Sequence, residues 1–386
     1  MIDEYTEESQ ARQAPQVSPS TAIGPYSSLL PGPMCLRLDL DPAGDGSPLG
    51  WGVVMGSMEL ETGYNSIGLE ERISSGGLPW DEVMPVLEEL CGCCSQSTTL
   101  AFVEAVESMA SLVVPPRAAY LRLVLVEVER VVSHLLNAAE MLDELGMSHR
   151  ASSLRDLRER TIHAMAEWSG ARFQPGLIAF GGLSRHIDEA TSKELLVALR
   201  PVERALRAEV PLIINSREVA ERLAGLGAIR LEQAAATGLR GPNARASGLA
   251  DDIRSSVPTG AYEEEAVTIV VQRAGDAYAR LVVRLLEALE SFRVVEQALD
   301  DLPTGPVKTR VSLEMRTGSG IGRVEGPRGE TFCWIQAGEK GLVGLHLSTG
   351  SFPVLGILEG FLPGKRLDDL RLLLLSLDIC MGCVER

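Results

Sequence analysis

Aromatic side chains, positive charge and long apolar segments are all scarce in this chain. Aromatic residues make up 4% of its 386 residues, so the chain offers no stacking platform for single-stranded nucleic acid. Acidic residues outnumber basic residues by 53 to 36, and the formal net charge is −17. This charge argues against a binding track for nucleic-acid phosphates and against unaided adsorption to anionic lipid. A protein partner is therefore the expected neighbour.

No apolar run approaches the ~18 residues that a membrane-spanning helix needs. The longest candidates, residues 121–128 and 370–377, are interrupted by Arg, Glu or Ser. We therefore expect any association with a membrane to depend on partner subunits.

A disulfide framework is not expected either. The chain has seven cysteines, which is an odd number, and three of them fall within four positions. No secretory signal is recognisable, so the cytosol is the expected compartment. With 45% hydrophobic residues, the chain can bury a large core.

What the chain does have is two Cys-x-x-Cys pairs near its opposite ends, CGCC at residues 91–94 and CMGC at residues 380–383. The turn inside such a pair brings both sulfurs within reach of one soft metal and leaves backbone amides free to bind the thiolates. A zinc ribbon closes its two pairs over about 15 to 20 residues. Here the fold must bring the pairs together into one four-sulfur metal site. The other cysteines, Cys35, Cys93 and Cys333, are expected to be small buried hydrophobic residues.

The N-terminal part is predicted to change from a tail to strands and then to helices. Residues 1–23 are rich in Gln, Ser, Pro and Glu, which is typical of a flexible tail. Apolar residues at 34–41 and 50–56 flank an Asp-, Gly- and Pro-rich segment, which predicts a hairpin or paired strands. From Pro79 onward a helical period leads into the first cysteine pair, and a second helix follows over residues 98–110. The first pair is therefore expected at a junction of two helices.

The middle of the chain is predicted to be a helical bundle. Its longest helix is expected over residues 119–145 and has apolar residues nearly all round, so it should be a central, buried strut. Further helical periods predict helices over residues 154–168, 192–224 and 277–299.

One face of the longest helix would carry Glu127, Arg130 and His134. That face could carry a proton-transfer chain, or its side chains could form a satisfied buried ion pair. The sequence leaves both interpretations open.

The pattern changes to strands after Pro306. Residues 331–337 and 341–347 are predicted strands joined by Glu339 and Lys340, and a final helix over residues 367–377 leads to the second cysteine pair. The glycines that precede these strands lack the strand and helix of a dinucleotide-binding motif, so we attribute them to turns.

The sequence thus predicts an α+β protein that is mostly α, with small peripheral β elements. We expect a flexible tail over residues 1–23 and one domain over residues 24–386. Its parts would be an α/β entry (24–90), a helical bundle (91–303), and a β hairpin with a closing helix (304–386).

Several motifs resemble the 49-kDa (D) subunit of respiratory complex I. The likeness extends over roughly residues 24–386. That subunit shares its fold with the large subunit of nickel–iron hydrogenases, so the resemblance implies a hydrogenase-large-subunit-like helical bundle here. The motifs are PPRAAYLR at residues 115–122, continued by Glu127, Arg130 and His134, LRGPNARASG at 239–248, GDAY at 275–278 and VEGPRGE at 324–330.

The cysteines divide the two branches of this family. Complex I subunits resemble hydrogenase large subunits that have lost their metal-binding cysteines, whereas this chain has all four at the matching positions. It is therefore more similar to energy-converting (group 4) hydrogenases. Their first signature, Arg-x-Cys-Gly-x-Cys followed by His or Thr, resembles residues 91–98. Their second, Asp-Pro-Cys-x-x-Cys-x-x-Arg or -His, resembles DICMGCVER at residues 378–386, and the chain stops where such precursors are cut after metal insertion.

The resemblance implies reversible interconversion of hydrogen with protons and electrons at a nickel–iron centre. Cys91 and Cys380 would be terminal nickel ligands. Cys94 and Cys383 would bridge nickel to an iron that carries cyanide and carbonyl ligands, since thiolates suit this soft, redox-active pair.

The resemblance also implies four catalytic or proton-handling residues. Cys380, as a terminal thiolate, would accept the proton when hydrogen is split. Arg328 would polarise the vacant coordination side above the metals, and Asp378 would hydrogen-bond near it. Glu70 matches a carboxylate of the family and would lie on a proton path.

Other landmarks of the family differ here. Glu89 replaces the Arg of the first signature, a charge reversal that would raise the cost of the neighbouring thiolates. Ile379 replaces the Pro of the second signature, as in complex I. The Gly-Pro-x-His-Pro segment reads GPYSS at residues 24–28, and a later His-Arg-Gly reads SIG at residues 66–68. The tyrosine associated with the quinone head group in complex I falls at Gly92, so the metal ligands are kept better than their surroundings.

Three functions remain open from the sequence. The first is the catalytic large subunit of a membrane-associated hydrogenase, with zinc as the alternative metal. The second is an electron-transfer subunit of complex I type that couples to quinone, and the third is a metal-free scaffold of a proton-pumping complex. The resemblance implies an iron–sulfur small subunit like the complex I B subunit, a C-subunit-like protein and membrane subunits as partners, on the cytoplasmic face of the cell membrane. Iron–sulfur clusters would belong to the partners, because this chain has no further set of four cysteines.

Overall fold

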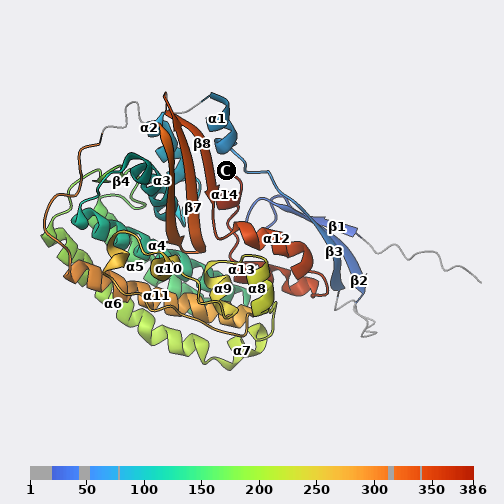
Figure 1. Ribbon diagram of the computed structural model, residues 1–386. Helices are drawn as coiled ribbons and strands as arrows, with labels where there is room; N and C mark the ends of the chain where they lie inside the picture. The colour runs from blue at the N-terminus through green and yellow to red at the C-terminus, as the bar shows by residue number, and fades with distance from the viewer. Residues whose placement is uncertain (1–19, 43–52, 77–78, 312–316, 340) are drawn as a thin grey trace, which may run out of the picture.

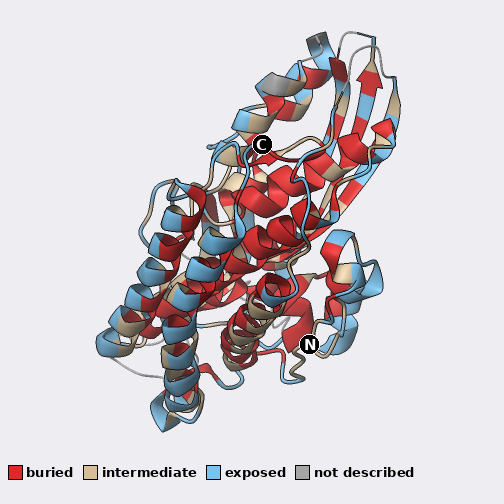
Figure 2. Cartoon of the chain, turned by 90° about the vertical axis from the view of Figure 1, so that its left-hand side faces the viewer, coloured by how far each residue is buried: buried red, intermediate tan, exposed pale blue. Residues whose placement is uncertain are grey.

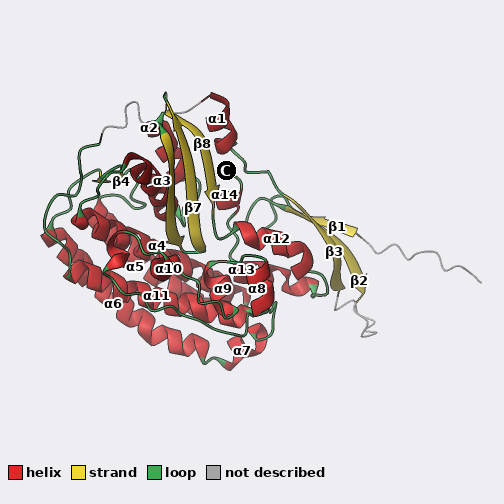
Figure 3. Cartoon of the chain, in the orientation of Figure 1, coloured by secondary structure: helices red, strands yellow, loops and turns green. Residues whose placement is uncertain are grey.

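Most elements of the molecule are helices (Figure 3), in agreement with the predicted α+β, mostly α class. The predicted tail falls largely outside the residues that the structure describes. Its last four residues, however, form strand β1 (Ser20–Ile23), because they pair with the edge of an ordered hairpin. The computed structural model, whose elements are labelled in Figure 1, describes residues 20–42, 53–76, 79–311, 317–339 and 341–386.

The predicted N-terminal hairpin is confirmed by strands β2 (Cys35–Pro42) and β3 (Val53–Glu61), which pair antiparallel. The predicted turn between them lies within residues 43–52, outside the described residues. Alternation along β2 buries Leu36 and Leu38, which belong to an apolar cluster that includes helices from the C-terminal part of the chain. The hairpin is therefore held by the end of the chain.

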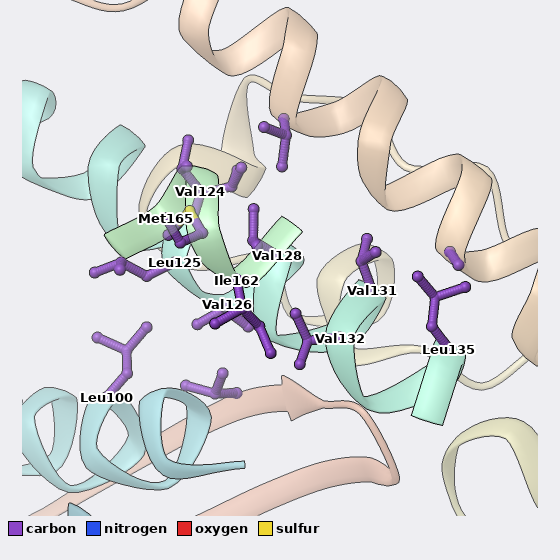
Figure 4. Packing of buried hydrophobic residues seen from close by; sticks show 14 of the residues in the cluster. Leu100, Val124, Leu125, Val126, Val128, Val131, Val132, Leu135, Ile162 and Met165 are labelled. Atoms are coloured by element: carbon purple, nitrogen blue, oxygen red, sulfur yellow. The ribbon is translucent and has the colours of Figure 1, made fainter. Parts of the chain in front are cut away.

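Helix α4 (Pro116–Glu144) is the predicted central strut, and it packs against α5 (Ser148–Ser169) and α11 (Ala277–Asp300). Proline occupies its first turn, where no backbone donor is lost, and Gly146 with a φ of 79° lies beyond its end. Figure 2 shows that buried residues are concentrated in these central helices. Figure 4 shows buried side chains of this core, among them Val124, Leu125, Val128, Val131 and Leu135.

The prediction of one helix over residues 192–224 is wrong. The structure has α6 (Glu189–Ile214) followed by α7 (Arg217–Leu223). The break has a local cause, because the Ser216 hydroxyl accepts a hydrogen bond from the backbone N–H of Val219 and so caps a new helix.

The glycine-rich segment before the predicted strands is itself a strand rather than a series of turns. β6 (Gly318–Gly326) pairs antiparallel with β7 (Gly329–Gly338), and β7 pairs with β8 (Gly341–Ser348), so the prediction of only two strands is corrected. The glycines allow β6 to lie directly against α3 (Ser95–Ala110). A Cβ atom on Gly320 would lie 2.0 Å from the Ala105 carbonyl oxygen, and one on Gly322 would lie 1.9 Å from that of Ala101.

The predicted closing helix, residues 367–377, begins as a 3-10 turn and continues as α13. Among the described helices, none is long and apolar enough to cross a membrane. The remaining elements are α1 (Leu69–Gly76), α2 (Trp80–Glu89), β4 (Ile178–Ala179), β5 (Gly182–Leu183), α8 (Leu231–Ala236), α9 (Gly241–Ala246), α10 (Ile253–Ser256), η1 (Gly260–Glu263), β7 (Gly329–Gly338), β8 (Gly341–Ser348), α12 (Phe352–Phe361), η2 (Leu367–Asp369), α13 (Leu370–Leu377) and α14 (Met381–Val384).

Candidate metal centre

The two cysteine pairs occupy turns at the ends of helices. The first lies between α2 and α3, at the predicted helix junction, and the second lies at the start of α14. Asp378 adopts the left-handed conformation, with a φ of 55°, and its N–H donates to the carbonyl oxygens of Leu374 and Leu375. This turn ends α13 and redirects the chain, so that Cys380 and Cys383 face the first pair.

The four paired cysteines form one cluster. The Sγ atoms of Cys94 and Cys383 are 2.7 Å apart, and those of Cys91 and Cys380 are 3.2 Å apart. All four sulfur atoms lie within 4.8 Å of one another, with Cys94 and Cys383 buried and the other two partly exposed. Each close contact joins one cysteine of each pair, so the fold brings the two ends of the chain to one place.

A backbone contact beneath the sulfur atoms sets the distance between the pairs. A Cβ atom on Gly382 would lie 2.2 Å from the carbonyl oxygen of Leu90, which immediately precedes the first pair. Real Cβ atoms do not come this close to backbone oxygens, so glycine is required for the two turns to touch.

One partly buried arginine lies beside the sulfur cluster. Arg328, in the turn between β6 and β7, donates from Nε to the carbonyl oxygen of Asp378 (2.9 Å) and from Nη2 to its Oδ1 (2.8 Å). Although burial disfavours its charge, Asp378 and the cysteine sulfurs raise the pKa of Arg328 well above its ordinary value. Its Nη1 is buried and has no hydrogen-bond partner among the described residues.

The cysteines influence one another's protonation. Contact with Cys380 raises the pKa values of Cys91, Cys94 and Cys383, whereas hydrogen bonds from those three thiols lower the pKa of Cys380 well below its ordinary value. These contacts favour the thiolate form at Cys380 over the other three cysteines. A metal cation would supply the positive charge that displaces the remaining protons.

These residues fit a soft metal centre. Four sulfur atoms so close together can converge on one ion, or on two ions that share two bridging sulfurs. The unpaired Nη1 of Arg328 offers one further donor at the edge of the cluster. The donor set suits both the nickel–iron centre and zinc, the two metals considered from the sequence.

Glu70 lies away from this arginine, at the start of α1. Its Oε1 accepts hydrogen bonds from the N–H of Leu347 (2.9 Å) and from Nε of Arg386 (3.0 Å). Arg386 in turn donates from Nη1 to the carbonyl oxygen of Cys383 (3.1 Å). Glu70 is thus connected to the second cysteine pair through Arg386.

The altered signature positions lie in different surroundings. The Glu89 side chain is exposed at the end of α2, and the charge beside the sulfur atoms is that of Arg328. Ile379 is 3% exposed and packs in the apolar cluster of the C-terminal helices. Cys35 and Cys333 are buried as predicted, but that prediction is wrong for Cys93, which is half-buried in the turn before α3, where its N–H donates to the Cys91 sulfur.

The face of α4 with Glu127, Arg130 and His134 belongs to a buried ion network. Arg130 and Arg254 outweigh the effect of burial and lower the pKa of Glu127, which also accepts hydrogen bonds from Ser291 and Tyr262. His134 is 3.0 Å from Glu287, and burial lowers its pKa to about 4. For Glu127 and Arg130 the contacts correspond to the satisfied ion pair that the sequence left open, whereas Nδ1 of His134 is buried without a hydrogen-bond partner among the described residues.

Sequence reasoning missed Glu129, which also lies on α4. Its two carboxylate oxygens accept hydrogen bonds from the backbone N–H groups of Gln96 (2.6 Å) and Ser97 (3.0 Å), at the start of α3. It therefore performs the role of an N-cap for the helix that begins just after Cys94. Nothing in the local sequence links Glu129 to the cysteine pair, because the contact depends on how the helices pack.

Sequence reasoning also missed the side chains that bind carbonyl oxygens at the end of α13. Three successive carbonyl oxygens, those of Leu375, Ser376 and Leu377, accept side-chain hydrogen bonds, and that of Leu375 also accepts one from the Asp378 N–H. The donors come from three other helices and are Asn137, Arg284 and Asn243, at 2.8, 2.9 and 2.9 Å.

Comparison with known proteins identifies one family. A sequence model described as the 49 Kd subunit of respiratory-chain NADH dehydrogenase matches residues 145–316 and 310–386. The chain is 28% identical to a carbon monoxide-induced hydrogenase of Rhodospirillum rubrum, over 94% of this chain and 98% of that protein. It is 31% identical to the membrane-bound hydrogenase subunit alpha of Pyrococcus furiosus, over 86% and 81%.

A third relative carries a quinone-linked name. The chain is 33% identical to a D-type NADH-quinone oxidoreductase subunit of Herpetosiphon aurantiacus, over 78% of this chain and 84% of that protein. Among solved structures, the fold matches a chain of the membrane-bound sulfane sulfur reductase, an archaeal respiratory membrane complex, with a TM-score of 0.85. That match has 24% identity and covers 97% of this chain and 100% of the other. The three sequence relatives named are oxidoreductase subunits.

Proposed function

Because the chain belongs to the family of the 49 kDa subunit of respiratory-chain NADH dehydrogenase, we propose that it is the catalytic large subunit of a membrane-associated nickel–iron hydrogenase of complex I type. The proposed reaction is the reversible conversion of one hydrogen molecule to two protons and two electrons.

The observation that carries this proposal is the four-sulfur cluster of Cys91, Cys94, Cys380 and Cys383. A scaffold without a metal has no need for two matched Cys-x-x-Cys pairs whose sulfur atoms meet across the molecule. Arg328, which lies beside the cluster and whose buried Nη1 has no hydrogen-bond partner among the described residues, adds to this argument.

The burial of the cysteines supports a division of roles. Cys94 and Cys383 are buried and contact each other, which suits the two bridging ligands. Cys91 and Cys380 are partly exposed and contact each other, which suits the terminal ligands of the ion that hydrogen must reach.

When bound, the nickel–iron centre supplies the heterolytic cleavage of hydrogen and receives its two electrons. The Cys380 sulfur is the proposed proton acceptor, because contact with the other three cysteines lowers its pKa and because it is partly exposed. Asp378 orients Arg328 through two hydrogen bonds. The free Nη1 of Arg328 can then stabilise negative charge on the open side of the sulfur cluster.

The electrons must leave to a partner. We propose an iron–sulfur subunit that packs beside the cluster, where apolar side chains are exposed on segments that contact the cysteine turns. Phe173, whose carbonyl oxygen accepts a hydrogen bond from Gln96, is 49% exposed, and Tyr64, on the loop that contacts Glu385, is 36% exposed. Exposed rings beside a redox centre suit a protein interface.

The proposed location is the cytoplasmic face of a membrane, reached through partner subunits. The Pyrococcus relative is named as a membrane-bound hydrogenase subunit. Membrane subunits and a complex I C-subunit-like protein would complete the assembly.

The test is to mature the chain together with its partner subunits and nickel-insertion proteins, and then to measure metal content and hydrogen uptake with an artificial electron acceptor. We expect about one nickel per chain and hydrogen-dependent reduction of the acceptor. Full occupancy by zinc without nickel would overturn the proposal.

A second candidate is an electron-transfer subunit that couples to quinone. The observation that favours it is the 33% identity to the D-type NADH-quinone oxidoreductase subunit. Quinone reduction by the assembled complex without hydrogen uptake would select this candidate.

A further inference from the structure

Glu385 and Arg386, two and three residues after Cys383, bind distant parts of the chain. The Glu385 side chain is buried, at 6% exposure. Its Oε1 accepts a hydrogen bond from the N–H of Gly63, and its Oε2 accepts one from the N–H of Asn65, each at 2.6 Å. Hydrogen bonds to a carboxylate are stronger than neutral ones. Glu385 therefore fixes the end of the chain to the loop between β3 and α1.

Arg386 makes a second set of contacts on the same side of the site. It donates to Oε1 of Glu70 and to the carbonyl oxygen of Cys383, and its guanidinium lies over the Phe352 ring, 5.7 Å from the centroid. Glu70 also accepts from the N–H of Leu347 in β8. Figure 1 shows the chain terminus beside α1, β8 and α14. We call Glu385 and Arg386, with these contacts, the C-terminal anchor.

The second cysteine pair has little local structure of its own. α14 has four residues, from Met381 to Val384, and its first residue lacks a side-chain cap. A single helical turn fixes more backbone dihedrals than its hydrogen bonds compensate for. The position of Cys383 therefore depends on contacts with other parts of the chain. Thr349 donates from Oγ1 to the Cys383 carbonyl oxygen (3.3 Å), and Ser351 Oγ accepts from the Cys380 N–H (3.1 Å). The residues on either side of this turn make further contacts.

We propose that Glu385 and Arg386 are positioning residues that hold Cys380 and Cys383 against Cys91 and Cys94. The anchor fixes the chain directly beyond Cys383, and Asp378 fixes it before Cys380. The cluster is then formed before any metal binds. This inference does not rest on the hydrogenase assignment.

The test uses the full-length, reduced, metal-free chain. Brief oxidation with diamide, which takes up the two electrons and two protons of each thiol pair, is followed by mass-spectrometric mapping of the disulfides. The wild-type protein should form mainly Cys94–Cys383 and Cys91–Cys380 bonds, because those sulfur atoms are 2.7 and 3.2 Å apart. The ratio of these bonds to bonds within each pair is the measured quantity.

Glu385→Ala removes both acceptors from the Gly63 and Asn65 N–H groups. We expect the ratio to fall at least about tenfold, which corresponds to ~1.4 kcal/mol, because two charge-assisted hydrogen bonds are lost. Glu385→Gln should give an intermediate ratio, since its amide keeps one acceptor but opposes the other N–H. Glu359→Ala, on the exposed face of nearby α12, is the control and should leave the ratio unchanged.

The melting temperature of each variant separates positioning from general stability. A ratio that falls in Glu385→Ala while circular dichroism and melting stay close to wild type supports the proposal. An unchanged ratio in a folded Glu385→Ala protein would overturn it. If that variant does not fold, Arg386→Lys answers the question, because it keeps the charge and loses the Nε contact with Glu70. No metal is added, so a failure to load nickel would leave this result standing.

Discussion

The two cysteine pairs reach one site by different structural means. The first pair is followed by α3, a helix of 16 residues whose first N–H groups bind Glu129 and whose side chains are largely buried against the sheet. The second pair is followed by a four-residue turn and is held by side chains from other parts of the chain. The first half of the site is thus supported mainly by regular local structure, and the second half by contacts of long sequence separation.

This difference has a consequence for assembly of the site. A helix forms from contacts between near neighbours, so the first pair can adopt its conformation early. The second pair depends on α4, α9 and α11 through the side chains that bind the end of α13. The second pair can reach its final position only after those helices have packed. We therefore expect substitutions near the second pair to have larger effects than substitutions near the first pair.

The largest effect should come from removing one sulfur of the second pair. Cys383→Ser should reduce the nickel content of the matured complex from about one per chain to near zero and abolish hydrogen uptake, because a hydroxyl is a poor ligand for a soft metal. Nickel analysis checks this. Cys93→Ser, in the first turn but outside the cluster, should keep its nickel. Unchanged function in Cys383→Ser would favour the metal-free scaffold.

Substitution of a glycine in one of the two cysteine turns should give the next largest effect, and the two glycines should differ. Gly382→Ala should lower the free energy of unfolding by about 2–3 kcal/mol, since its Cβ would overlap the Leu90 carbonyl oxygen at 2.2 Å and force the pairs apart. Gly92→Ala should be nearly neutral, because nothing lies within 4 Å of the added atom. Chemical denaturation of the metal-free chains measures both. Equal losses of stability in the two variants would show that both turns leave equally little room for a Cβ atom.

Loss of a side chain that binds the end of α13 should have a smaller effect on stability. Asn137→Ala removes the donor that binds the Leu375 carbonyl oxygen at 2.8 Å. The Leu375 carbonyl oxygen keeps the hydrogen bond from the Asp378 N–H, so the loss of this one hydrogen bond should destabilise the fold by about 1 kcal/mol. Asn215→Ala, at an exposed position, is the matched control for denaturation experiments. A loss confined to the control would contradict the role assigned to the end of α13.

The structure could be predicted from the sequence where local patterns determine it. Helix α4, strands β7 and β8, and the junction at the first cysteine pair follow from period, proline and glycine signals. The four cysteines could be chosen by their spacing and by the family resemblance, and the fold brings their sulfur atoms together.

The sequence was insufficient where packing decides. The glycines of β6 do not predict a strand from sequence. Glycine is required there because α3 packs closely against β6, and that contact exists only in the folded structure. Glu129, Asn137 and Glu385 act on backbone groups far away in the sequence, and no local pattern marks such contacts. Glu89, which raised the strongest objection to the metal site, is exposed, and the nearby charge comes from Arg328 instead.

The smallest effect should concern pH and the first pair. Burial raises the pKa of Glu129 above its ordinary value of 4.5, although the N–H groups of Gln96 and Ser97 act in the opposite direction. A raised folded-state pKa means that the stability linked to this carboxyl is full below the unfolded value and is lost as pH rises through the folded value. Glu129→Gln cannot titrate, so its free energy of unfolding should depend less on pH above 4.5 than that of the wild type, whereas Glu232→Gln, an exposed control, should follow the wild type. If the free energy of unfolding depends on pH in the same way in the wild type and in Glu129→Gln, the hydrogen bonds from α3 offset the burial of the carboxylate. The support that Glu129 gives to the first pair would then not depend on pH.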